Sequence, residues 1–427
     1  MGLFILLGLF ALLITFGLPV AYALGIAALS SFFYEGLPVL IGVQRIVSGV
    51  SIFSLLAIPF FIFAGELMLH GGIAAKLVRL ASSAVGWARG GLGQVNVFSS
   101  MLFGGISGSA VADVSALGSL LIPVMKEKGY GDDYAVNVTV TSSVAGIMIP
   151  PSHNMILYAV AAGGGISVSN LFLAGIIPGV LMCIALGFAA RWVAIRKNYP
   201  TEPFAGWMAV GVAAISAVPG LFTAVIIVGG SLSGVFTVTE SGAIGCIYAI
   251  VITMFVYRSL SWQGFCTSVQ RAVRTTGMVM ILVGCASAFG YMLALYDVPK
   301  MLTDMLYVIS DNPIIILLMM NMMLLILGMI MDMGALILIC TPIFLPVAVG
   351  LGMDPIQFGI MLMMNLGLGL CTPPVGGCLF VGCAIGDVPI QRAVKSIWPF
   401  YLAIFSALML ITFVPAVSMI LPNLIGL

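Results

Sequence analysis

Charged residues are scarce in this chain. Only 7% of its 427 residues are Asp, Glu, Lys or Arg, whereas 62% are hydrophobic. A soluble globular protein carries roughly 25% charged residues, so this sequence has too few charges to cover a surface that faces water. The net charge is +1, which gives no electrostatic reason to expect a nucleic-acid partner. The composition therefore predicts an all-α polytopic membrane protein.

Histidine is nearly absent, and cysteine occurs without a metal-binding or redox spacing. His70 and His153 are the only histidines, and they lie far apart in the sequence. The eight cysteines include no CxxC pair; Cys378 and Cys383 are the closest two, and both lie in apolar sequence. This pattern argues against a metal cluster and predicts that the cysteines are small apolar packing residues rather than disulfides.

Apolar runs that are long enough, or nearly long enough, to cross a bilayer fill most of the chain. A membrane-spanning helix needs about 20 residues. The first run has no basic segment before it and no small-residue cleavage site after it, so we expect a spanning helix there rather than a removed signal. The expected spans are residues 2–17, 20–34, 52–70, 133–165, 169–191, 207–229, 236–257, 272–297, 355–386 and 396–421.

Two Pro-Pro pairs interrupt two of these apolar segments. Pro150 is followed by Pro151, and Pro373 is followed by Pro374. Proline has no backbone N–H and clashes with the preceding turn, so each pair breaks its helix. Lipid cannot satisfy the freed backbone groups, and such breaks persist in a membrane only where protein or a polar cavity covers them. Paired breaks in the two halves of a chain predict a secondary transporter whose site lies between them.

Two further apolar stretches, 91–125 and 313–347, are interrupted near the middle by glycine-rich segments. The first interruption is residues 104–109, and the second is residues 328–334. Glycine permits backbone conformations that other residues avoid, and so it favours a sharp turn. We interpret both stretches as re-entrant hairpins, which enter and leave the membrane on the same side.

The two halves of the chain have matching landmarks. Pro123 and Pro150 are 27 residues apart, as are Pro346 and Pro373, and the two pairs are offset by 223 residues. The same offset pairs Gly105 with Gly328, Ser109 with Asp332, Gly146 with Gly369 and Pro151 with Pro374. We therefore predict two repeats, which contain one hairpin and one broken helix each: residues 1–205, with the broken helix 133–165, and residues 206–427, with the broken helix 355–386.

The basic residues indicate how the two repeats are oriented. If each repeat crosses the membrane five times, the second is inverted relative to the first. Cytoplasmic loops of membrane proteins are enriched in Lys and Arg. With residues 76–90 in the cytoplasm, thirteen of the fifteen basic residues fall on that side, and only Arg45 and Lys300 fall outside it. This distribution favours an inverted repeat with both chain termini outside the cytoplasm.

The first hairpin break and the first Pro-Pro break together supply a set of oxygen donors. Ser107 and Ser109 bring hydroxyl groups, and the proline pair frees backbone carbonyls near Gly146, Met148 and Pro150. Hydroxyl and carbonyl oxygens suit a hard alkali cation. We predict a first cation site from these five residues. The alternative is that the small residues of the hairpin only allow close helix packing.

The equivalent positions in the second half predict a second cation site. They are Gly328, Asp332 and Gly334 in the hairpin, with Gly369 and Thr372 in the opposing break. Asp332 lies in an apolar segment, where a carboxylate is costly and is therefore a functional candidate. It either binds a cation or carries a proton, or it caps a helix at the hairpin tip. The sequence leaves these interpretations open.

Residues at the two Pro-Pro breaks are the candidates for binding the transported molecule. They are Ser152, His153 and Asn154 after the first pair, and Pro374 in the second. A helix that starts at such a break presents unpaired N–H groups and the positive end of its dipole, which favours an anion. His153 either faces the cavity or is a buried, hydrogen-bonded histidine.

Several separate stretches resemble the large membrane subunit of tripartite ATP-independent periplasmic (TRAP) transporters, the DctM-like family. They run over most of the chain: Ala57–Phe61, Ala64–Met68, Phe103–Ala110, Gly146–Ser152, Leu171–Gly179, Thr239–Ser241 and Cys371–Gly376. The chain departs from the family pattern at His153, where a hydrophobic residue is frequent. It also departs at Val238, which stands where the family often has proline before Thr-Glu-Ala.

The resemblance implies an inverted-repeat elevator in the bacterial inner membrane, with a scaffold and a mobile transport part that holds both hairpins. It implies sodium as the coupling ion, one at each hairpin, and no organic cofactor. The implied cargo is an organic acid: a C4-dicarboxylate, a 2-oxo acid or a sialic acid. The likeness to the sialic acid branch makes sialic acid our single expectation. The implied partners are a small membrane subunit (DctQ-like) and a periplasmic substrate-binding protein (DctP-like).

Two other functions are compatible with parts of the sequence. A stand-alone sodium–carboxylate symporter of related architecture would transport without partner proteins. An intramembrane aspartyl protease is suggested by the segment Gly129–Asp132 together with Asp332. However, Asp132 falls in a charged loop, and no aspartate is expected to pair with it on a neighbouring helix. We therefore expect a transporter rather than an enzyme.

Overall fold

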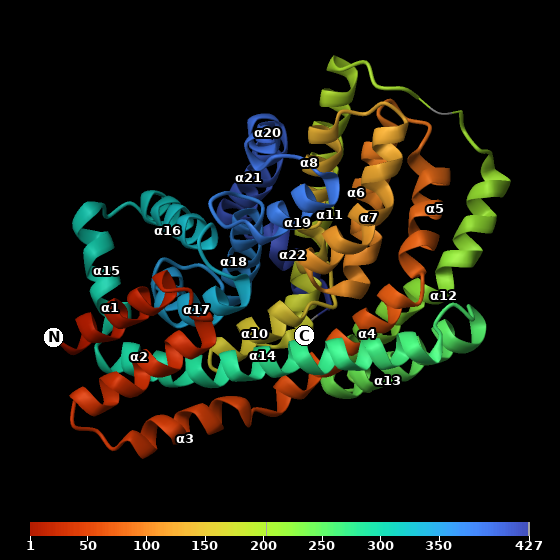
Figure 1. Cartoon of the computed structure of the whole chain (residues 1–427). Helices are drawn as coiled ribbons and strands as arrows, with labels where there is room; N and C mark the ends of the chain where they lie inside the picture. The colour runs from red at the N-terminus through yellow and green to blue at the C-terminus, as the bar shows by residue number, and fades with distance from the viewer. Residues whose placement is uncertain (202, 426–427) are drawn as a thin grey trace.

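The computed structural model describes residues 1–201 and 203–425 and contains helices but no strand among them (Figure 1). The first half contains α1 (Gly2–Thr15), α2 (Val20–Tyr34), α3 (Val39–Val50), η1 (Phe53–Leu56), α4 (Ala57–His70), α5 (Ile73–Val85), α6 (Gly91–Ser107), α7 (Ala110–Glu127), α8 (Asp132–Ser142), α9 (Ala145–Met148), α10 (His153–Ala161) and α11 (Val168–Arg196). The second half contains α12 (Trp207–Leu232), α13 (Val238–Ile250), η2 (Val251–Val256), α14 (Trp262–Leu295), α15 (Val298–Ile309), α16 (Pro313–Gly328), α17 (Met333–Gly350), α18 (Pro355–Leu370), α19 (Gly377–Gly386), α20 (Ile390–Ser396), α21 (Trp398–Phe413) and α22 (Ala416–Ile425). The predicted boundary between residues 205 and 206 lies in the connection from α11 to α12, where residue 202 is outside the described residues.

The lengths of the helices confirm a polytopic membrane protein. Among the described residues, six helices are long and apolar enough to cross a membrane, or up to nine if each bent pair of helices is one span. The first two expected spans are shorter than a full crossing, because α1 has 14 residues and α2 has 15. At 1.5 Å per residue these helices extend roughly 21 to 23 Å, whereas the hydrocarbon core is about 30 Å thick.

Three short helices, α3, α5 and α15, are absent from the sequence interpretation. They contain 12, 13 and 12 residues, and each mixes polar residues with one apolar face. A search for long apolar runs passes over such helices. The structure also starts α14 at Trp262, ten residues before the expected start, because the helix continues through Arg271 and Arg274. Charged residues are tolerated where a helix leaves the apolar layer.

Both predicted hairpins are present as pairs of packed helices. α6 contacts α7 around a turn at Gly108 and Ser109, and α16 contacts α17 around residues 329–332. The first break is narrower than predicted, because α6 continues through Gly104 to Ser107. Gly108 has φ +59°, a left-handed conformation that glycine adopts without strain. The turn therefore depends on one glycine rather than on the whole glycine-rich segment.

The first Pro-Pro pair breaks its helix as predicted. α9 ends at Met148, and α10 begins at His153. The peptide bond between Pro150 and Pro151 is cis, and the helical segments before and after it are bent by 54°. The break therefore places four residues of irregular backbone between two helix ends.

The second Pro-Pro pair forms the corresponding break. α18 ends at Leu370, and α19 begins at Gly377. The peptide bond between Pro373 and Pro374 is also cis. Both halves of the chain thus contain a packed hairpin and a helix that a Pro-Pro pair interrupts.

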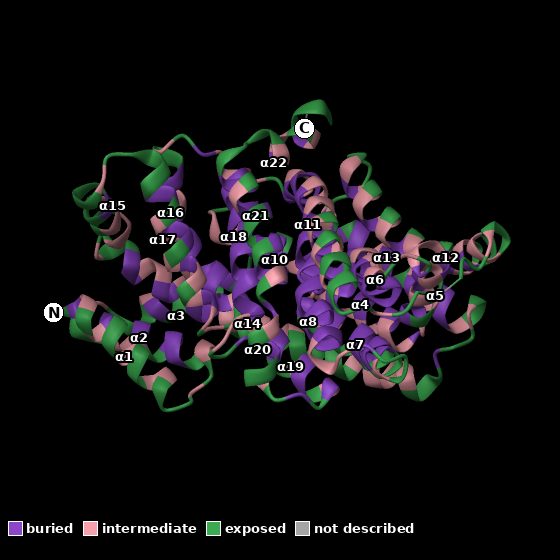
Figure 2. Ribbon diagram, turned by 90° about the horizontal axis from the view of Figure 1, so that it is seen from above, coloured by how far each residue is buried: buried purple, intermediate pink, exposed green. Residues whose placement is uncertain are grey.

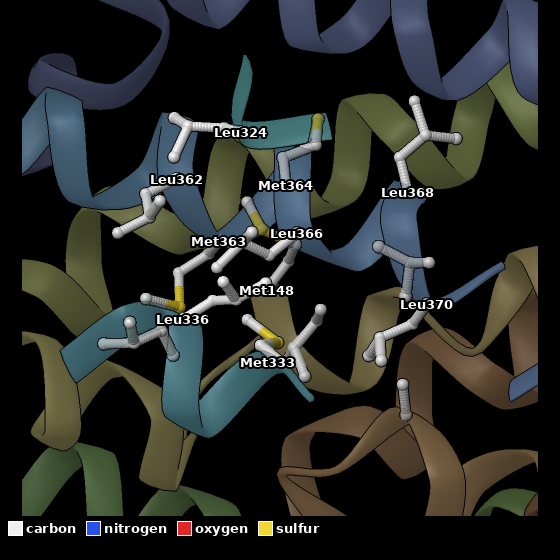
Figure 3. Close-up of a cluster of buried hydrophobic side chains, with 14 of the residues drawn as sticks. Met148, Leu324, Met333, Leu336, Leu362, Met363, Met364, Leu366, Leu368 and Leu370 are labelled. Atoms are coloured by element: carbon white, nitrogen blue, oxygen red, sulfur yellow. The ribbon is translucent and has the colours of Figure 1, made fainter. Parts of the chain in front are cut away.

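The core lies around α8 and α18, where buried residues concentrate (Figure 2). Every residue of α18 from Gln357 to Leu370 is buried, so this helix is surrounded on all sides. Figure 3 shows Met148 of α9 beside Met333 of α17 and Met363 of α18 in one apolar cluster. The first broken helix and the second hairpin therefore share a core.

α14 runs lengthwise through the molecule beside the N-terminal helices (Figure 1). It has 34 residues and contacts α2, α3 and α4. α4 in turn packs against α6 of the first hairpin and against α10, which follows the first break. α4 and α14 therefore form a wall beside the turn of the first hairpin, where the candidate site lies.

Candidate functional site

The turn of the first hairpin lies against the first Pro-Pro break, backbone to backbone. A Cβ atom placed on Gly108 would lie 2.9 Å from the carbonyl oxygen of Pro151, and one on Gly105 would lie 3.2 Å from that of Pro150. A Cβ placed on Gly104 would lie 2.9 Å from the carbonyl oxygen of Ala145. Side chains at these positions would separate the two segments. The glycines of the hairpin therefore allow its turn to approach the break.

The broken helix also has a glycine, Gly146, at its contact with the hairpin turn. A Cβ placed on Gly146 would lie 3.2 Å from the carbonyl oxygen of Ser109. Ser109 is also the N-cap of α7, where its hydroxyl accepts a hydrogen bond from the N–H of Ala112 at 3.5 Å. The structure thus brings together Ser107, Ser109, Gly146 and Pro150, four of the five residues predicted for the first cation site.

Oxygen atoms without hydrogen-bond partners gather at this contact. The hydroxyl oxygens of Ser107 and Ser152 are buried and have no partner among the described residues. No described residue donates a hydrogen bond to the carbonyl of Pro150 or Pro151. Buried polar groups normally have a partner, so these oxygens are free to coordinate an ion or a water molecule. Uncharged oxygen donors fit an alkali cation.

Met148 differs from the other residues of the predicted set. Its side chain lies in the apolar core (Figure 3). Its carbonyl oxygen contacts α11 at Gly175, where a Cβ atom would collide with it. The carbonyl of Pro151, by contrast, faces the hairpin. The sequence does not indicate in which direction either carbonyl points. The carbonyl of Ala145 also faces the hairpin, although neither Pro151 nor Ala145 is among the five residues predicted for the first cation site.

The second hairpin meets the second break in a similar way. A Cβ atom placed on Gly369 would lie 2.8 Å from the carbonyl oxygen of Gly328. The carbonyl of Met329 accepts a hydrogen bond from the N–H of Val375 at 3.0 Å, which ties the turn to the segment after the proline pair. The hydroxyl of Thr372 donates to the carbonyl of Leu368 at 2.7 Å. Gly328, Gly369 and Thr372 are thus gathered at one place.

Asp332 is the N-cap of α17. Its side chain accepts a hydrogen bond from the N–H of Gly334 at 2.9 Å. The residue is exposed rather than buried in an apolar environment. A carboxylate at a helix N-terminus is stabilised by the unpaired N–H groups and the helix dipole. The structure therefore contains the capping interaction that the sequence left open, and the carboxylate remains accessible to a cation.

Buried polar side chains connect each hairpin to its broken helix. Asn96 donates its amide to the hydroxyl of Thr139 at 2.6 Å, and Ser142 donates to the side-chain oxygen of Asn96 at 3.2 Å. The hydroxyls of Ser100 and Ser142 are 3.0 Å apart. Asp113 is fully buried on the adjacent α7. These bonds lock α6 against α8 in the first half.

A cavity of about 370 Å³, which both polar and apolar side chains line, opens beside the first hairpin turn. Ser107, Ser109 and His153 line it from the hairpin and from α10. α4 contributes Glu66, and α14 contributes Arg271. Of the four predicted substrate residues, His153 is therefore the one that lines this cavity; Ser152 and Asn154 are buried, and Pro374 is exposed at the second break.

Arg271 and Glu66 supply the charges of the cavity. Glu66 also interacts with His70 on the next turn of α4, with 3.6 Å between Oε2 and Nδ1, and lies within electrostatic reach of Arg271. The sequence prediction counted Arg271 among the cytoplasmic basic residues and did not include Glu66 among the candidate site residues. Arg271 lies one residue before the expected span 272–297, so nothing in the sequence indicated that it lines this cavity.

Comparison with known proteins identifies the family. Residues 7–417 match the family described as tripartite ATP-independent periplasmic transporter, DctM component. The chain belongs to this family. The DctM-family chain is 39% identical to the sialic acid TRAP transporter large permease protein SiaM of Vibrio cholerae, over 89% of each chain. It is 35% identical to the C4-dicarboxylate TRAP transporter large permease protein DctM of Rhodobacter capsulatus, over 95% of each chain.

A solved structure supports the fold of this DctM-family permease. The YdaH transporter of Alcanivorax borkumensis aligns with a TM-score of 0.63 and 14% identity, over 90% of this chain and 87% of that chain. This likeness concerns the fold only. The family match by itself makes the chain the large permease component of a tripartite transporter.

The protease alternative finds no support in the aspartates that suggested it. Asp132 lies in a charged cluster at the start of α8, 3.7 Å from Lys126 and 3.9 Å from Arg392. Asp332 caps α17 in the other half of the chain. Family membership assigns the chain to transporter permeases instead.

Proposed function

We propose that this DctM-family permease imports an organic acid together with sodium, by an elevator movement of its hairpins and broken helices. The observation that carries the proposal is the cavity of about 370 Å³ at the first hairpin turn, where Ser107, whose hydroxyl has no partner among the described residues, and Arg271 line the same space. This cavity combines oxygen donors and the Glu66 carboxylate, which suit a cation, with the Arg271 guanidinium, which suits a carboxylate.

The first sodium ion would bind between the hairpin turn and the first break. The donors would be the hydroxyls of Ser107 and Ser109 and the carbonyls of Pro150 and Pro151, since these oxygens lie at the contact of the two segments. The positive charge of sodium would balance the partial negative charges of these oxygens, in place of hydrogen-bond donors. Gly146 would allow the hairpin turn to approach the break closely, because it has no side chain to separate the two segments.

The second sodium ion would bind at the equivalent contact in the other half. Gly328, Gly369 and Thr372 converge there, and Asp332 with its neighbour Gly334 begins the following helix. The exposed carboxylate of Asp332 would add a negative charge close to the ion. Because both ions hold a hairpin turn against a break, loading would order the transport part before it moves.

The substrate carboxylate would lie in the cavity that Ser107 and Arg271 line, beside the first ion. Arg271 is suited to this task, because a guanidinium forms paired hydrogen bonds with a carboxylate. The hydroxyl of Ser107 and the ring of His153 line the same cavity and would contact the remainder of the molecule. Ser152 packs against the hairpin turn at Gly108 and does not line the cavity, so it would affect substrate binding only by holding the turn in place. Pro374 would meet the substrate only when the second break faces the cavity.

The moving part would consist of the two hairpins and the two broken helices. α4 and α14 would belong to the fixed scaffold. With the basic loops in the cytoplasm, both termini are periplasmic and the protein resides in the bacterial inner membrane. A small DctQ-like subunit and a DctP-like binding protein would complete the system, as the family description implies.

Sialic acid is the substrate that we propose first, because SiaM is among the relatives with high identity over most of the chain. A C4-dicarboxylate or a 2-oxo acid is the alternative cargo. A sialic acid carries one carboxylate and many hydroxyls, which agrees with a cavity that offers one arginine among several hydroxyl groups.

Uptake into proteoliposomes tests the proposal. Labelled sialic acid, a C4-dicarboxylate and a 2-oxo acid are compared with and without an inward sodium gradient, and with this chain alone or with both partner proteins. Uptake that needs sodium and both partners supports the proposal and identifies the substrate. Uptake by this chain alone establishes a stand-alone symporter instead. Uptake without a sodium gradient contradicts sodium coupling.

A further inference from the structure

A second cavity, of about 240 Å³, lies where α11 ends and α21 begins. Its volume corresponds to roughly eight water molecules at about 30 Å³ each. Tyr134 of α8 and Phe400 of α21 are buried and form its walls. Basic side chains from α11 and α20 surround its opening. The cavity is separate from the transport site and has no part in the mechanism proposed above.

Three basic side chains line this cavity, and they differ in their partners. Lys197 pairs with Asp133, 3.2 Å from Nζ to Oδ2. The guanidinium of Arg196 lies 4.0 Å above the ring of Trp192 and has no carboxylate partner among the described residues. Lys395 makes no ion pair with any residue that the structure describes. Two positive charges, from two different helices, are therefore available for an anion at one cavity.

The position of the cavity places it at the level of the lipid headgroups. α11 is a membrane-spanning helix that ends at Arg196, and α21 starts at Trp398. The side chain of Trp192 is 47% exposed and that of Trp398 is 61% exposed. Exposed tryptophans at the ends of spanning helices are typical of the boundary between hydrocarbon and headgroups.

An exposed apolar stripe leads from this cavity along α11 into the membrane. Ile184, Phe188 and Trp192 follow one another at intervals of four residues, and Arg196 continues the series. Residues at this spacing lie on one face of a helix. Ile184 is 50% exposed and Phe188 is 69% exposed. One face of α11 thus carries the apolar side chains of Ile184 and Phe188, and the same face reaches the cavity at Trp192 and Arg196.

We propose that this cavity is a binding site for an anionic phospholipid. The phosphate lies between Arg196 and Lys395, and an acyl chain lies along Ile184 and Phe188. Basic pockets between membrane helices bind anionic lipid headgroups for this electrostatic reason. A free phosphate would use only the two cations, whereas a phospholipid also covers the exposed stripe. The site therefore selects the lipid.

Binding of fluorescently labelled phosphatidylglycerol to the purified full chain in detergent tests this site. The double variant Arg196→Gln/Lys395→Gln is compared with Arg79→Gln/Arg274→Gln, which removes the same charge from exposed residues of α5 and α14 outside the cavity. Because one basic residue near an anionic lipid contributes about a fivefold change in binding, the cavity variant should bind roughly 25-fold more weakly. The control variant should bind as the unmodified chain does.

Three results would overturn the proposal. Equal weakening in both double variants would show attraction to net charge rather than to a site. Equal binding of labelled phosphatidylcholine would show that the negative headgroup is not recognised. Displacement of the labelled lipid by soluble glycerol phosphate at the concentration at which unlabelled phosphatidylglycerol displaces it would show that the acyl stripe adds nothing. Phe188→Ser, which keeps both cations, should weaken lipid binding without changing the affinity for glycerol phosphate.

Discussion

Asn365 donates its side-chain amide to the side-chain oxygen of Asn321 across 2.9 Å, which ties α18 to the first helix of the second hairpin. Ser142 makes the corresponding bond to Asn96 in the first half, at 3.2 Å. Asn321 follows Asn96 by 225 residues and Asn365 follows Ser142 by 223, close to the offset of the prolines. The two halves therefore join hairpin and broken helix with the same kind of contact.

Replacing Asn365 with Ala should destabilise the protein, because it leaves the buried Asn321 with an unpaired oxygen. Loss of one partner of a buried hydrogen bond costs about 1–3 kcal/mol. Thermal unfolding in detergent measures the loss. Asn321→Ala and the double variant complete a mutant cycle, in which the double variant should lose less than the sum of the two single losses. Additive losses would contradict a direct coupling between the two residues.

Gly108→Ala should disrupt the first hairpin far more than a glycine change at an open turn. Both Gly108, with φ +59°, and Gly129, with φ +81°, have left-handed backbone. A Cβ on Gly108 would meet the carbonyl of Pro151 at 2.9 Å, whereas nothing lies within 4 Å of one on Gly129. Strain alone costs about 1 kcal/mol, and overpacking adds roughly 1–3 kcal/mol. Thermal unfolding of Gly108→Ala and of the control Gly129→Ala should separate backbone strain from overpacking. Equal losses of stability in the two variants would show that the contact with Pro151 is unimportant.

Ser107→Ala should raise the sodium concentration for half-maximal uptake without reducing thermal stability, because the buried hydroxyl of Ser107 has no hydrogen-bond partner to lose. Thr372→Ala should also raise the sodium concentration for half-maximal uptake, through the second site. Ser115→Ala is the matched control, since Ser115 lines the same cavity but donates its hydroxyl to the carbonyl of Val111 at 2.8 Å. If sodium half-saturation is unchanged in both Ser107→Ala and Thr372→Ala, these residues are not sodium ligands.

Arg271→Gln should raise the KM for the organic acid by about tenfold or more, because a hydrogen bond to a charged group contributes roughly 1.5–3 kcal/mol. Arg271→Lys should recover part of this loss by restoring the charge without the paired geometry. Arg274→Gln serves as control, because Arg274 is exposed on the same helix and does not line the cavity. Uptake kinetics in proteoliposomes distinguish these variants. An unchanged KM in Arg271→Gln would remove the arginine from the substrate site.

Much of the architecture follows from local chemistry. Single prolines such as Pro178 and Pro219 lie inside continuous helices, whereas each Pro-Pro pair breaks its helix, so the breaks at Pro150 and Pro373 are readable from the paired prolines. The hairpin turns are readable too, because glycine permits the left-handed conformation that Gly108 adopts. The short helices α3, α5 and α15 escaped this reading, since length and apolar content do not distinguish a short amphipathic helix from a loop.

The sequence by itself determined that this is an all-α membrane protein, where its helices break, and which residues cluster near the breaks. The tertiary structure decided which groups face one another. It turned the carbonyl of Pro151 toward the hairpin and that of Met148 toward α11, and it brought Arg271 into the cavity of Ser107. These outcomes depend on packing between segments far apart in the chain, whereas the Pro-Pro breaks and the left-handed turn at Gly108 depend on the backbone of neighbouring residues.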